Sequence, residues 1–374
     1  MTVIGGGVIG AAVTHALAAR GVAVALLEAE AELAMAASGS NSGILHTGFD
    51  SEPGELETEL ILRAGELREA VLERLGVPVL RCGAVLRPRS SEEAETVATL
   101  AARAARNGVE STIGDHGSLD VPGESVTDPV AYTEALAAAA VAAGTELRLG
   151  APVEALEGGA GRITVRTADG EPLTCSVVVN CAGLRADEVA AMAGDESFSI
   201  YPRKGEFFVF EPPGAGALER ILLPVPTKRT KGVLVFPTVD GKLIAGPTAH
   251  DQDDKDDWSV RPGAFDEVMP KVVAMLPSLE GAEPIASYAG LRPAGRGCNY
   301  VIGPSLANPR LINVAAIRST GLTASLGIAD RVVGLVAGAG VELGSVRDLA
   351  HERPPAGDGE PWWRRATGRE FSVR

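Results

Sequence analysis

The chain has 374 residues, of which 45% are hydrophobic and only 4% aromatic, and it carries a formal net charge of −15. This length allows two domains with a sizeable core, and the acidic balance argues against nucleic acid or an anionic membrane surface as a general partner. Gly, Pro or charged residues interrupt every long apolar stretch before about 18 residues, so we expect no transmembrane helix. The four cysteines form no C-x-x-C pair, which gives no metal signature and favours a reduced, cytoplasmic setting.

The N-terminal segment predicts a nucleotide-binding strand–turn–helix. A short apolar strand leads into G-x-G-x-x-G at Gly5, Gly7 and Gly10, and an Ala-rich helix follows. The first glycine permits the tight turn, the second lets the backbone approach a pyrophosphate, and the third lets the helix pack close to the sheet. Val8 and Ile9 lie at the helix start, where free N–H groups face the phosphates.

An acidic residue at the end of the second strand indicates which nucleotide this unit prefers. Glu28 follows the apolar run 22–27, and a carboxylate there can accept both ribose hydroxyls of an adenosine. It would repel a 2′-phosphate, so the unit favours NAD or FAD over NADP. The first strand is unusually short, because only three residues lie between the initial Met and Gly5. We therefore expect the native start to lie a few residues upstream. We expect no signal peptide, because the turn already uses the apolar start.

A polar stretch of small residues, 37–43, comes next and includes Ser38, Ser42 and Gly43. Small side chains and free N–H groups suit a loop that lies along an extended cofactor, and a flexible surface loop is the alternative. We prefer the cofactor because the stretch follows the ribose-binding strand directly and delivers His46 at its end.

The middle of the chain alternates helices and short strands. Apolar spacing and start and stop signals predict helices at 54–76, 91–106 and 129–144, the last with Asp128 as N-cap. Strands are expected at 77–87, at 146–149, at 153–156 (beginning with Val153), and in a hairpin of 162–167 and 173–179. A buried β-branched run that stops at small residues, here Ala182 and Gly183, is how a strand ends against a nucleotide.

From residue 200 the pattern changes to an antiparallel sheet, with strands at 205–211, 232–237 and 242–246. A further strand leads to Arg292. The last helix begins at Gly321, and its first turn, with Leu322 and Thr323, offers free N–H groups to an anionic or electron-rich ring edge. Past about residue 340 we expect the chain to be irregular. This segment contains Trp-Trp-Arg-Arg at 362–365, which could touch a membrane surface, but the negative net charge of the protein disfavours such contact.

His46 and Arg292 are the strongest candidates for chemistry. Histidine titrates near neutral pH and suits a base that removes a hydroxyl proton, although a lone histidine is often structural. Arg292 precedes a proline and projects from a rigid position, and its fork suits phosphate or carboxylate equally. A structural ion pair is the alternative. The other four histidines, His15, His116, His250 and His351, are interpreted as solvated.

Weaker candidates for an anion site are other cations and a serine. Lys231 has basic neighbours, and a charge run is often only a solvated face. Lys204 and Arg318 are candidates of the same kind. Ser319 precedes the last helix and can bond substrate or flavin, with an N-cap as its structural alternative.

With these pieces in place, the chain resembles the flavin oxidoreductases of the D-amino-acid oxidase and glycerol-3-phosphate dehydrogenase superfamily. The general match lies in the N-terminal glycine motif with Glu28, the strand end 180–183 and the helix at Gly321, which together indicate FAD rather than NAD. More specific motifs, at 41–46, 201–206, 231–233 with 246–249, and 317–323, resemble the soluble glycerol-3-phosphate oxidase and dehydrogenase branch, with L-2-hydroxyglutarate oxidases as close relatives.

The resemblance implies hydride transfer from a small anionic secondary alcohol to flavin N5, most simply from sn-glycerol 3-phosphate. It implies His46 as base, and Lys231, Arg292 and Ser319 as the residues that hold the substrate. Alternatives are L-2-hydroxyglutarate, another 2-hydroxy acid or an amino acid as substrate, and, in another class, a non-catalytic flavin-binding redox sensor. The chain carries none of the C-terminal cysteines that receive electrons in some relatives, so the acceptor, oxygen or a quinone, stays open, as does the oligomeric state.

The implied fold is α/β, with a Rossmann-like FAD-binding domain of the glutathione-reductase type and an interleaved α+β substrate domain built on an antiparallel sheet. We expect residues 1–75, 127–196 and 297–345 in the FAD-binding domain, 76–126 and 197–296 in the substrate domain, and 346–374 in an irregular tail. The expected cofactor-binding residues are Gly5, Gly7, Val8, Ile9, Gly10, Glu28, Ser38, Ser42, Gly43, Val153, Ala182, Gly183, Gly321, Leu322 and Thr323.

Overall fold

A six-stranded sheet collects segments from both ends of the chain, in the order β20-β21-β13-β1-β2-β9. The computed structural model describes all residues except 160, 169, 215, 228–231, 351–359 and 369–374. The strands of this sheet are β1 (Thr2–Ile4), β2 (Ala25–Leu27), β9 (Glu146–Arg148), β13 (Val178–Asn180), β20 (Val301–Pro304) and β21 (Leu311–Ala315). All pairs are parallel except β20 with β21.

Both faces of this sheet are covered, which explains its nearly continuous apolar strands. One layer is helical: α1 (Val8–Ala18), α2 (Leu56–Leu75), α4 (Pro129–Ala142) and α7 (Gly321–Gly338). The other face carries α5 (Ala186–Met192) and a three-stranded meander, β10 (Val153–Gly159), β11 (Arg162–Thr167) and β12 (Leu173–Cys175). Alternation along β1 divides the two cores: Val3 packs with the helices and Ile4 with the meander.

Helix α7 is long and apolar enough to cross a membrane by length and composition. It packs against α1 and α2, and 61% of it is buried inside the protein. Its apolar composition is therefore explained by its place in the core beside the six-stranded sheet.

One expected strand is in fact two. We expected residues 173–179 to form the second strand of a hairpin, but β12 ends at Cys175 and pairs with β11, whereas β13 starts at Val178 and joins the parallel sheet. Both pieces are apolar and β-branched, so their pattern alone does not show the break. The expected turn at 168–170 includes Asp169, which lies outside the described residues.

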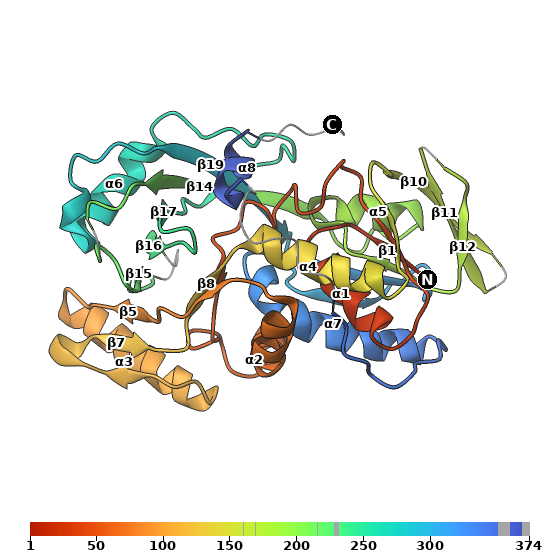
Figure 1. The fold of residues 1–374 in the computed structure, drawn as a ribbon, viewed down its shortest axis with the longest axis horizontal. Coiled ribbons are helices and arrows are strands. Elements are labelled where there is room, and N and C mark those ends of the chain that lie inside the picture. The colour runs from red at the N-terminus through yellow and green to blue at the C-terminus, as the bar shows by residue number, and fades with distance from the viewer. Residues whose placement is uncertain (160, 169, 215, 228–231, 351–359, 369–374) are drawn as a thin grey trace.

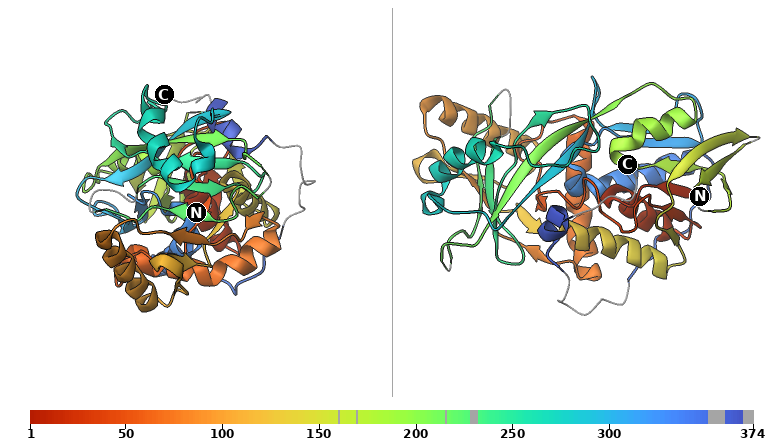
Figure 2. Two further views of the ribbon diagram at one scale, coloured as in Figure 1. Left: turned by 90° about the vertical axis from the view of Figure 1, so that its left-hand side faces the viewer. Right: turned by 90° about the horizontal axis from the view of Figure 1, so that it is seen from above.

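A nine-stranded sheet forms the other half of the molecule (Figure 1). Its strands are β5 (Ala84–Leu86), β6 (Thr112–Ile113), β7 (Leu119–Val121), β14 (Ile200–Phe210), β15 (Ile221–Leu223), β16 (Leu234–Pro237), β17 (Leu243–Gly246), β18 (His250–Asp251) and β19 (Ala286–Gly295). All pairs are antiparallel except β5 with β15. Its longest pair, β14 with β19, runs from this sheet toward the half that contains the six-stranded sheet, as the view from above shows (Figure 2).

Smaller elements complete the fold. Helices α3 (Ser91–Arg106) and α6 (Ala264–Met275) pack on the nine-stranded sheet. Three short strands form a separate sheet in the order β3 (Ile44–Leu45), β8 (Ser125–Thr127) and β4 (Val79–Leu80). Single-turn helices lie at η1 (Asp115–Gly117), η2 (Gly183–Arg185) and η3 (Pro277–Leu279). The α/β fold, with a Rossmann-like half and a half built on an antiparallel sheet, is confirmed.

Two further expectations are wrong. The tail was expected to be irregular, but residues Trp362–Gly368 form helix α8, and Trp362 and Trp363 are only 1% and 2% exposed. The pair packs beside β19 at the sheet, so its apolar surface serves the core (Figure 1). His15 was expected to be solvated, but it lies on the inner face of α1 and is 8% exposed. His116 and His250 are exposed as expected, and His351 lies outside the described residues.

Candidate active site

The glycine motif opens onto an elongated cavity of about 460 Å³, which we call the glycine-rich cavity. It lies between the ends of β1, β2 and β13 and the first turns of α1 and α7. Eleven of the expected cofactor residues line it: Gly5, Gly7, Val8, Ile9, Glu28, Ser38, Val153, Ala182, Gly183, Gly321 and Leu322. The fold therefore brings together five segments that are far apart in the sequence.

The first turn of α1 is open to an anion. Gly7 is its N-cap, contributes no side-chain cap, and is followed by a first turn without acidic residues. The N–H of Val8 donates to Ser38 Oγ at 3.0 Å, so the loop after β2 is held over the helix start. Partial positive charge at a helix N-terminus favours a phosphate there.

Glu28 lines the same cavity beside the glycine turn. Its Oε2 accepts the N–H of Gly6 at 2.6 Å, and its Oε1 accepts the N–H of Glu30 at 2.9 Å. Burial raises the pKa of Glu28, and these backbone donors act in the opposite direction. The carboxylate is thus held where β2 ends, with lone pairs left over for ribose hydroxyls. A helix N-terminus at one point and a fixed carboxylate at another fit the pyrophosphate and ribose of a dinucleotide.

Two of the expected cofactor glycines have backbone roles instead of lining the cavity. A Cβ on Gly10 would lie 1.8 Å from the carbonyl oxygen of Gly5, so this glycine allows α1 to pack tightly against the turn. Gly43 has φ +76°, and a Cβ there would lie 2.3 Å from the carbonyl oxygen of Thr127. Gly10 was expected to have such a packing role, whereas Gly43 is placed by its own backbone conformation beside β8.

Two other expected cofactor residues lie nearer to His46. Thr323 does not line the glycine-rich cavity: its Oγ1 accepts the N–H of His46 at 3.1 Å and donates to the carbonyl of Ile44 at 3.3 Å. Ser42 lines a second cavity, in which His46 also lies.

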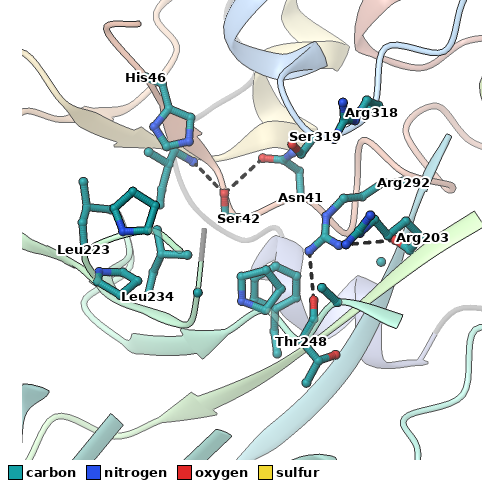
Figure 3. A pocket seen from close by; sticks show the side chains of 18 of the residues that line it. Asn41, Ser42, His46, Arg203, Leu223, Leu234, Thr248, Arg292, Arg318 and Ser319 are labelled. Carbon is teal, nitrogen blue, oxygen red and sulfur yellow. Dashed lines mark hydrogen bonds between the residues drawn. The ribbon is translucent and has the colours of Figure 1, made fainter. Parts of the chain in front are cut away.

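The second cavity, of about 410 Å³, adjoins the first and shares Ala37, Asn41 and Arg318 with it. We call it the basic cavity, since its polar wall includes three arginines (Figure 3). The polar lining includes Ser42, His46, Asp50, Arg203, Arg292, Arg318 and Ser319, and the apolar lining includes Phe49, Leu86, Leu100, Phe207, Leu223 and Leu234. His46 and the arginines reach it from different elements.

His46 enters the cavity from the end of β3 and is 27% exposed. Its Nδ1 lies 2.8 Å from Oε2 of Glu124, a carboxylate that is completely buried. Glu124 precedes β8, which pairs with β3, so the ladder that ends at Leu45 and Ser125 brings the two side chains together. Sequence reasoning missed Glu124. Nothing in its local pattern distinguishes it from the chain's many exposed acids, and only the β3–β8 pairing would have found it.

Arg292 stands on β19 directly opposite Arg203 on β14. Side chains of directly opposed residues share a face of the sheet, so both guanidinium groups point into the basic cavity. Arg292 donates to the carbonyls of Arg203 and Thr248 at 3.4 and 3.3 Å, and among the described residues no carboxylate pairs with it. Burial, followed by the charges of Arg203 and Arg318, lowers the pKa of Arg292 to about 10. An anion in the cavity would relieve this penalty.

The expectation for Lys204 is wrong. Because side chains alternate along β14, Lys204 points away from the face that carries Arg203. It is fully buried, and its Nζ lies 2.7 Å from Asp257 and donates to the carbonyl of Ser259. The pKa of Asp257 is lowered to about 2, mainly by its hydrogen bond with Lys204. Lys204 is therefore a structural ion-pair partner, and its neighbour Arg203 is the cation that reaches the cavity.

Arg318 and Ser319 both line the basic cavity and precede α7. The N-cap position of α7 is Thr320 rather than Ser319, and the Oγ1 of Thr320 donates to Glu57 at 2.7 Å. Arg318 adopts φ +57° and projects toward the junction of the two cavities. Lys231 lies outside the described residues.

The sequence is similar to a protein family and to several known proteins. The profile of the family described as FAD dependent oxidoreductase matches residues 1–335. A glycerol 3-phosphate dehydrogenase of Caloramator mitchellensis is 28% identical, over 90% of this chain and 73% of that protein. A glycerol 3-phosphate oxidase of Mycoplasma pneumoniae is 27% identical, over 89% of this chain and 93% of that protein. An L-2-hydroxyglutarate dehydrogenase of Escherichia coli is 29% identical, over 66% of this chain and 63% of that protein.

Structural similarity agrees with the sequence matches. The L-alpha-glycerophosphate oxidase of Mycoplasma pneumoniae, with FAD bound, superposes with a TM-score of 0.86 at 26% identity. The match covers 92% of this chain and 95% of that one. The glycine-rich cavity, with its open helix N-terminus and fixed carboxylate, fits the cofactor of that structure. Because the family profile spans almost the whole chain and the cavity fits its cofactor, this protein belongs to the FAD dependent oxidoreductase family.

Proposed function

We propose that this enzyme oxidises a small anionic secondary alcohol, and that sn-glycerol 3-phosphate, giving dihydroxyacetone phosphate, is its substrate. One observation carries the proposal: His46 and three arginines line a single cavity that adjoins the FAD site. The names of two relatives, a glycerol 3-phosphate dehydrogenase and a glycerol 3-phosphate oxidase, support the same substrate.

The three arginines would contact the anion from different sides of the cavity. Arg292 offers a fork that no carboxylate of the described residues occupies, and Arg203 beside it is 3.6 Å from Asp251. Arg318 and Ser319 come from the opposite side, before α7. Two or three guanidinium groups match a phosphate dianion better than a single carboxylate. The side chains of Ser42 and Ser319 are left to bond the hydroxyl groups of the substrate.

His46 would take the hydroxyl proton of the substrate. It lines the basic cavity, which shares Asn41 and Ala37 with the FAD site, so an alcohol held by the arginines would lie between the imidazole and the cofactor. When bound, FAD supplies the acceptor for the hydride that leaves the substrate carbon. We propose oxygen or a quinone as the final acceptor.

A second candidate substrate is L-2-hydroxyglutarate, or another 2-hydroxy acid or an amino acid. The arginine fork suits a carboxylate as well as a phosphate, and a relative is named L-2-hydroxyglutarate dehydrogenase. A non-catalytic flavin-binding sensor is the alternative from another class.

Anaerobic bleaching of the bound flavin separates these candidates. The purified yellow protein is mixed with glycerol 3-phosphate, L-2-hydroxyglutarate, other 2-hydroxy acids and amino acids, and the absorbance of oxidised flavin is followed. We expect rapid bleaching by glycerol 3-phosphate, and a loss of about 10²–10⁴-fold in that rate for FAD-saturated His46→Ala, the usual share of a positioned base. Bleaching only by a hydroxy acid or amino acid would replace the substrate, and bleaching by none would favour the sensor.

A further inference from the structure

We infer that Glu124 is a positioning residue for His46: it holds the imidazole proton on Nδ1 and so leaves Nε2 free to accept a proton from the substrate. The inference rests on the proposed function, in which His46 is the base. An imidazole with one proton can act as a base only at the nitrogen that lacks it. Which nitrogen that is depends on the partner of the other one.

The surroundings of Glu124 make it an acceptor. Its Oε1 accepts two donors from Thr47, the backbone N–H at 2.7 Å and Oγ1 at 2.9 Å. Its Oε2 lies 2.8 Å from Nδ1 of His46. The carboxylate is completely buried, so water does not share these bonds. A proton on Nδ1 completes this set of donors.

The backbone of His46 is fixed as well, which keeps Nδ1 against Glu124. Its N–H donates to Thr323 Oγ1 on α7, and its carbonyl accepts both terminal nitrogens of Arg68 on α2 at 3.3 Å. Arg68 also donates to the carbonyl of Thr323 at 3.0 Å. The ring is therefore positioned from two helices and the β3–β8 ladder. Its Nε2 points away from Glu124 and has no hydrogen-bond partner in the part of the chain that the structure describes.

Other titratable groups near this pair do not compete for the role. Tyr132 on α4 and Cys82 beside β4 both have a pKa raised by burial, so they stay neutral at ordinary pH. Burial lowers the pKa of Arg68, whereas electrostatic interactions with Tyr132 and Glu124 act to raise it. Asp50 also lines the basic cavity, whereas the ring nitrogen Nδ1 of His46 lies 2.8 Å from Oε2 of Glu124. Glu124 is thus the carboxylate that touches the imidazole.

The proton count of the reaction then follows. As the substrate C–H bond breaks and its hydride leaves for the cofactor, the substrate O–H proton moves to Nε2 and a C=O bond forms. His46 now carries both ring protons, and Glu124 faces the resulting positive charge at Nδ1. Release of the Nε2 proton to water restores the starting state. In other enzymes a buried carboxylate that fixes a histidine tautomer is worth up to about 10⁴-fold in rate.

The wild-type holoenzyme gives the first test. Long-range ¹H–¹⁵N spectra of protein labelled with ¹⁵N-histidine distinguish the two neutral tautomers, and the signals absent from His46→Ala identify the residue. At alkaline pH we expect His46 to carry its proton on Nδ1. A proton on Nε2 would overturn the inference whatever the activity, and this measurement needs no change at Glu124.

Glu124→Gln gives the second test, because Thr47 dictates how the new amide lies. The two Thr47 donors hold the amide oxygen in the place of Oε1, which turns the NH₂ group toward Nδ1 and forces the ring proton onto Nε2. We expect the tautomer signal to switch, flavin reduction to fall by about 10²–10⁴-fold, and FAD content and substrate binding to persist. An unchanged tautomer in the folded variant would contradict the inference.

A matched control uses another buried carboxylate. Asp195, which is 3% exposed, bonds Asn313 and the N–H groups of Ser197 and Leu306. Asp195→Asn makes the same chemical change away from both cavities and should alter neither the His46 signals nor the reduction rate. If Glu124→Gln switches the tautomer but reduction keeps its rate, the role of Glu124 stands and His46 is not the base, so the two proposals fail separately.

Discussion

A buried histidine far from the cavities makes the protein sensitive to acid. His15 faces inward from α1, and its Nε2 has no hydrogen-bond partner among the described residues. Burial, and secondarily the charge of Arg74, lowers the pKa of His15 from 6.5 to about 4. The folded protein therefore resists protonation of a group that the unfolded chain protonates readily.

This shift predicts how stability changes with pH. The pKa of His15 is lower in the folded protein than in the unfolded chain. The contribution of neutral His15 to the free energy of unfolding is therefore fully present above pH 6.5 and is lost as the pH falls toward 4. The loss attributable to His15 is about 3 kcal/mol at the lower limit. Urea unfolding of wild type and His15→Leu at both limits should show a smaller loss in the variant. An equal loss in both proteins would contradict it.

At the residue scale, the sequence identified side chains that follow a motif and missed those that depend on pairing. His46 and Arg292 stand next to recognisable strand and loop signals, and both line the basic cavity. The choice between Arg203 and Lys204 depended on which face of β14 meets the cavity, and no local pattern decides this. Glu124 is 78 residues from His46 and required the strand pairing.

At the scale of elements, the strand pair β14–β19 can accommodate Arg292 in the anion site only because one residue on β14 is a glycine. Gly205 lies on β14 beneath the guanidinium of Arg292, and a Cβ there would lie 2.2 Å from its Nη2. The same Cβ would lie 2.9 Å from Pro247 Cβ, so the arginine has little room to move aside. The glycine therefore provides the space in which the fork lies flat across the sheet.

Gly205→Ala should displace Arg292 without disturbing FAD. We expect the KM for the anionic substrate to rise by about tenfold or more, because loss of a charge-assisted bond costs about 1.5–3 kcal/mol, while flavin content stays normal. Gly303→Ala on β20, where a Cβ meets nothing within 4 Å, is the matched control. Steady-state kinetics decide, and a normal KM in Gly205→Ala would show that Arg292 does not hold the substrate.

At the scale of the whole molecule, the FAD site is assembled from remote segments around one glycine. Gly7 lines the cavity, and a Cβ there would lie 3.0 Å from Ser38 Oγ, which in turn accepts the N–H of Val8. A side chain at this point fills space that the pyrophosphate needs and pushes the loop off the helix start.

Gly7→Val should therefore yield a folded but colourless protein. The control is Gly65→Val on the exposed face of α2, where a Cβ meets nothing within 4 Å. Flavin absorbance relative to protein, together with far-ultraviolet circular dichroism, measures the outcome. Retention of FAD by Gly7→Val would mean that the phosphates do not lie against this turn.

The fold as a whole could be predicted further than its details. The glycine motif, the alternation of helices and strands and the later antiparallel pattern predicted both halves. The split of 173–179 into β12 and β13 and the helix α8 could not be predicted, because a continuous apolar run hides a change of sheet and two tryptophans give no sign of what they pack against. The domain boundaries stay a prediction.

The order of strands in the parallel sheet also sets when the cofactor can be captured during synthesis. The glycine turn leaves the ribosome long before its partners, because β1 pairs with β13 at Val178–Asn180 and α7 begins only at Gly321. Such long-range pairings form slowly, and until then the nascent chain exposes the unpaired edge of β1. FAD therefore joins the chain only after α7 has been synthesised, and a shortage of flavin would leave chains that already contain every segment of the site without their cofactor.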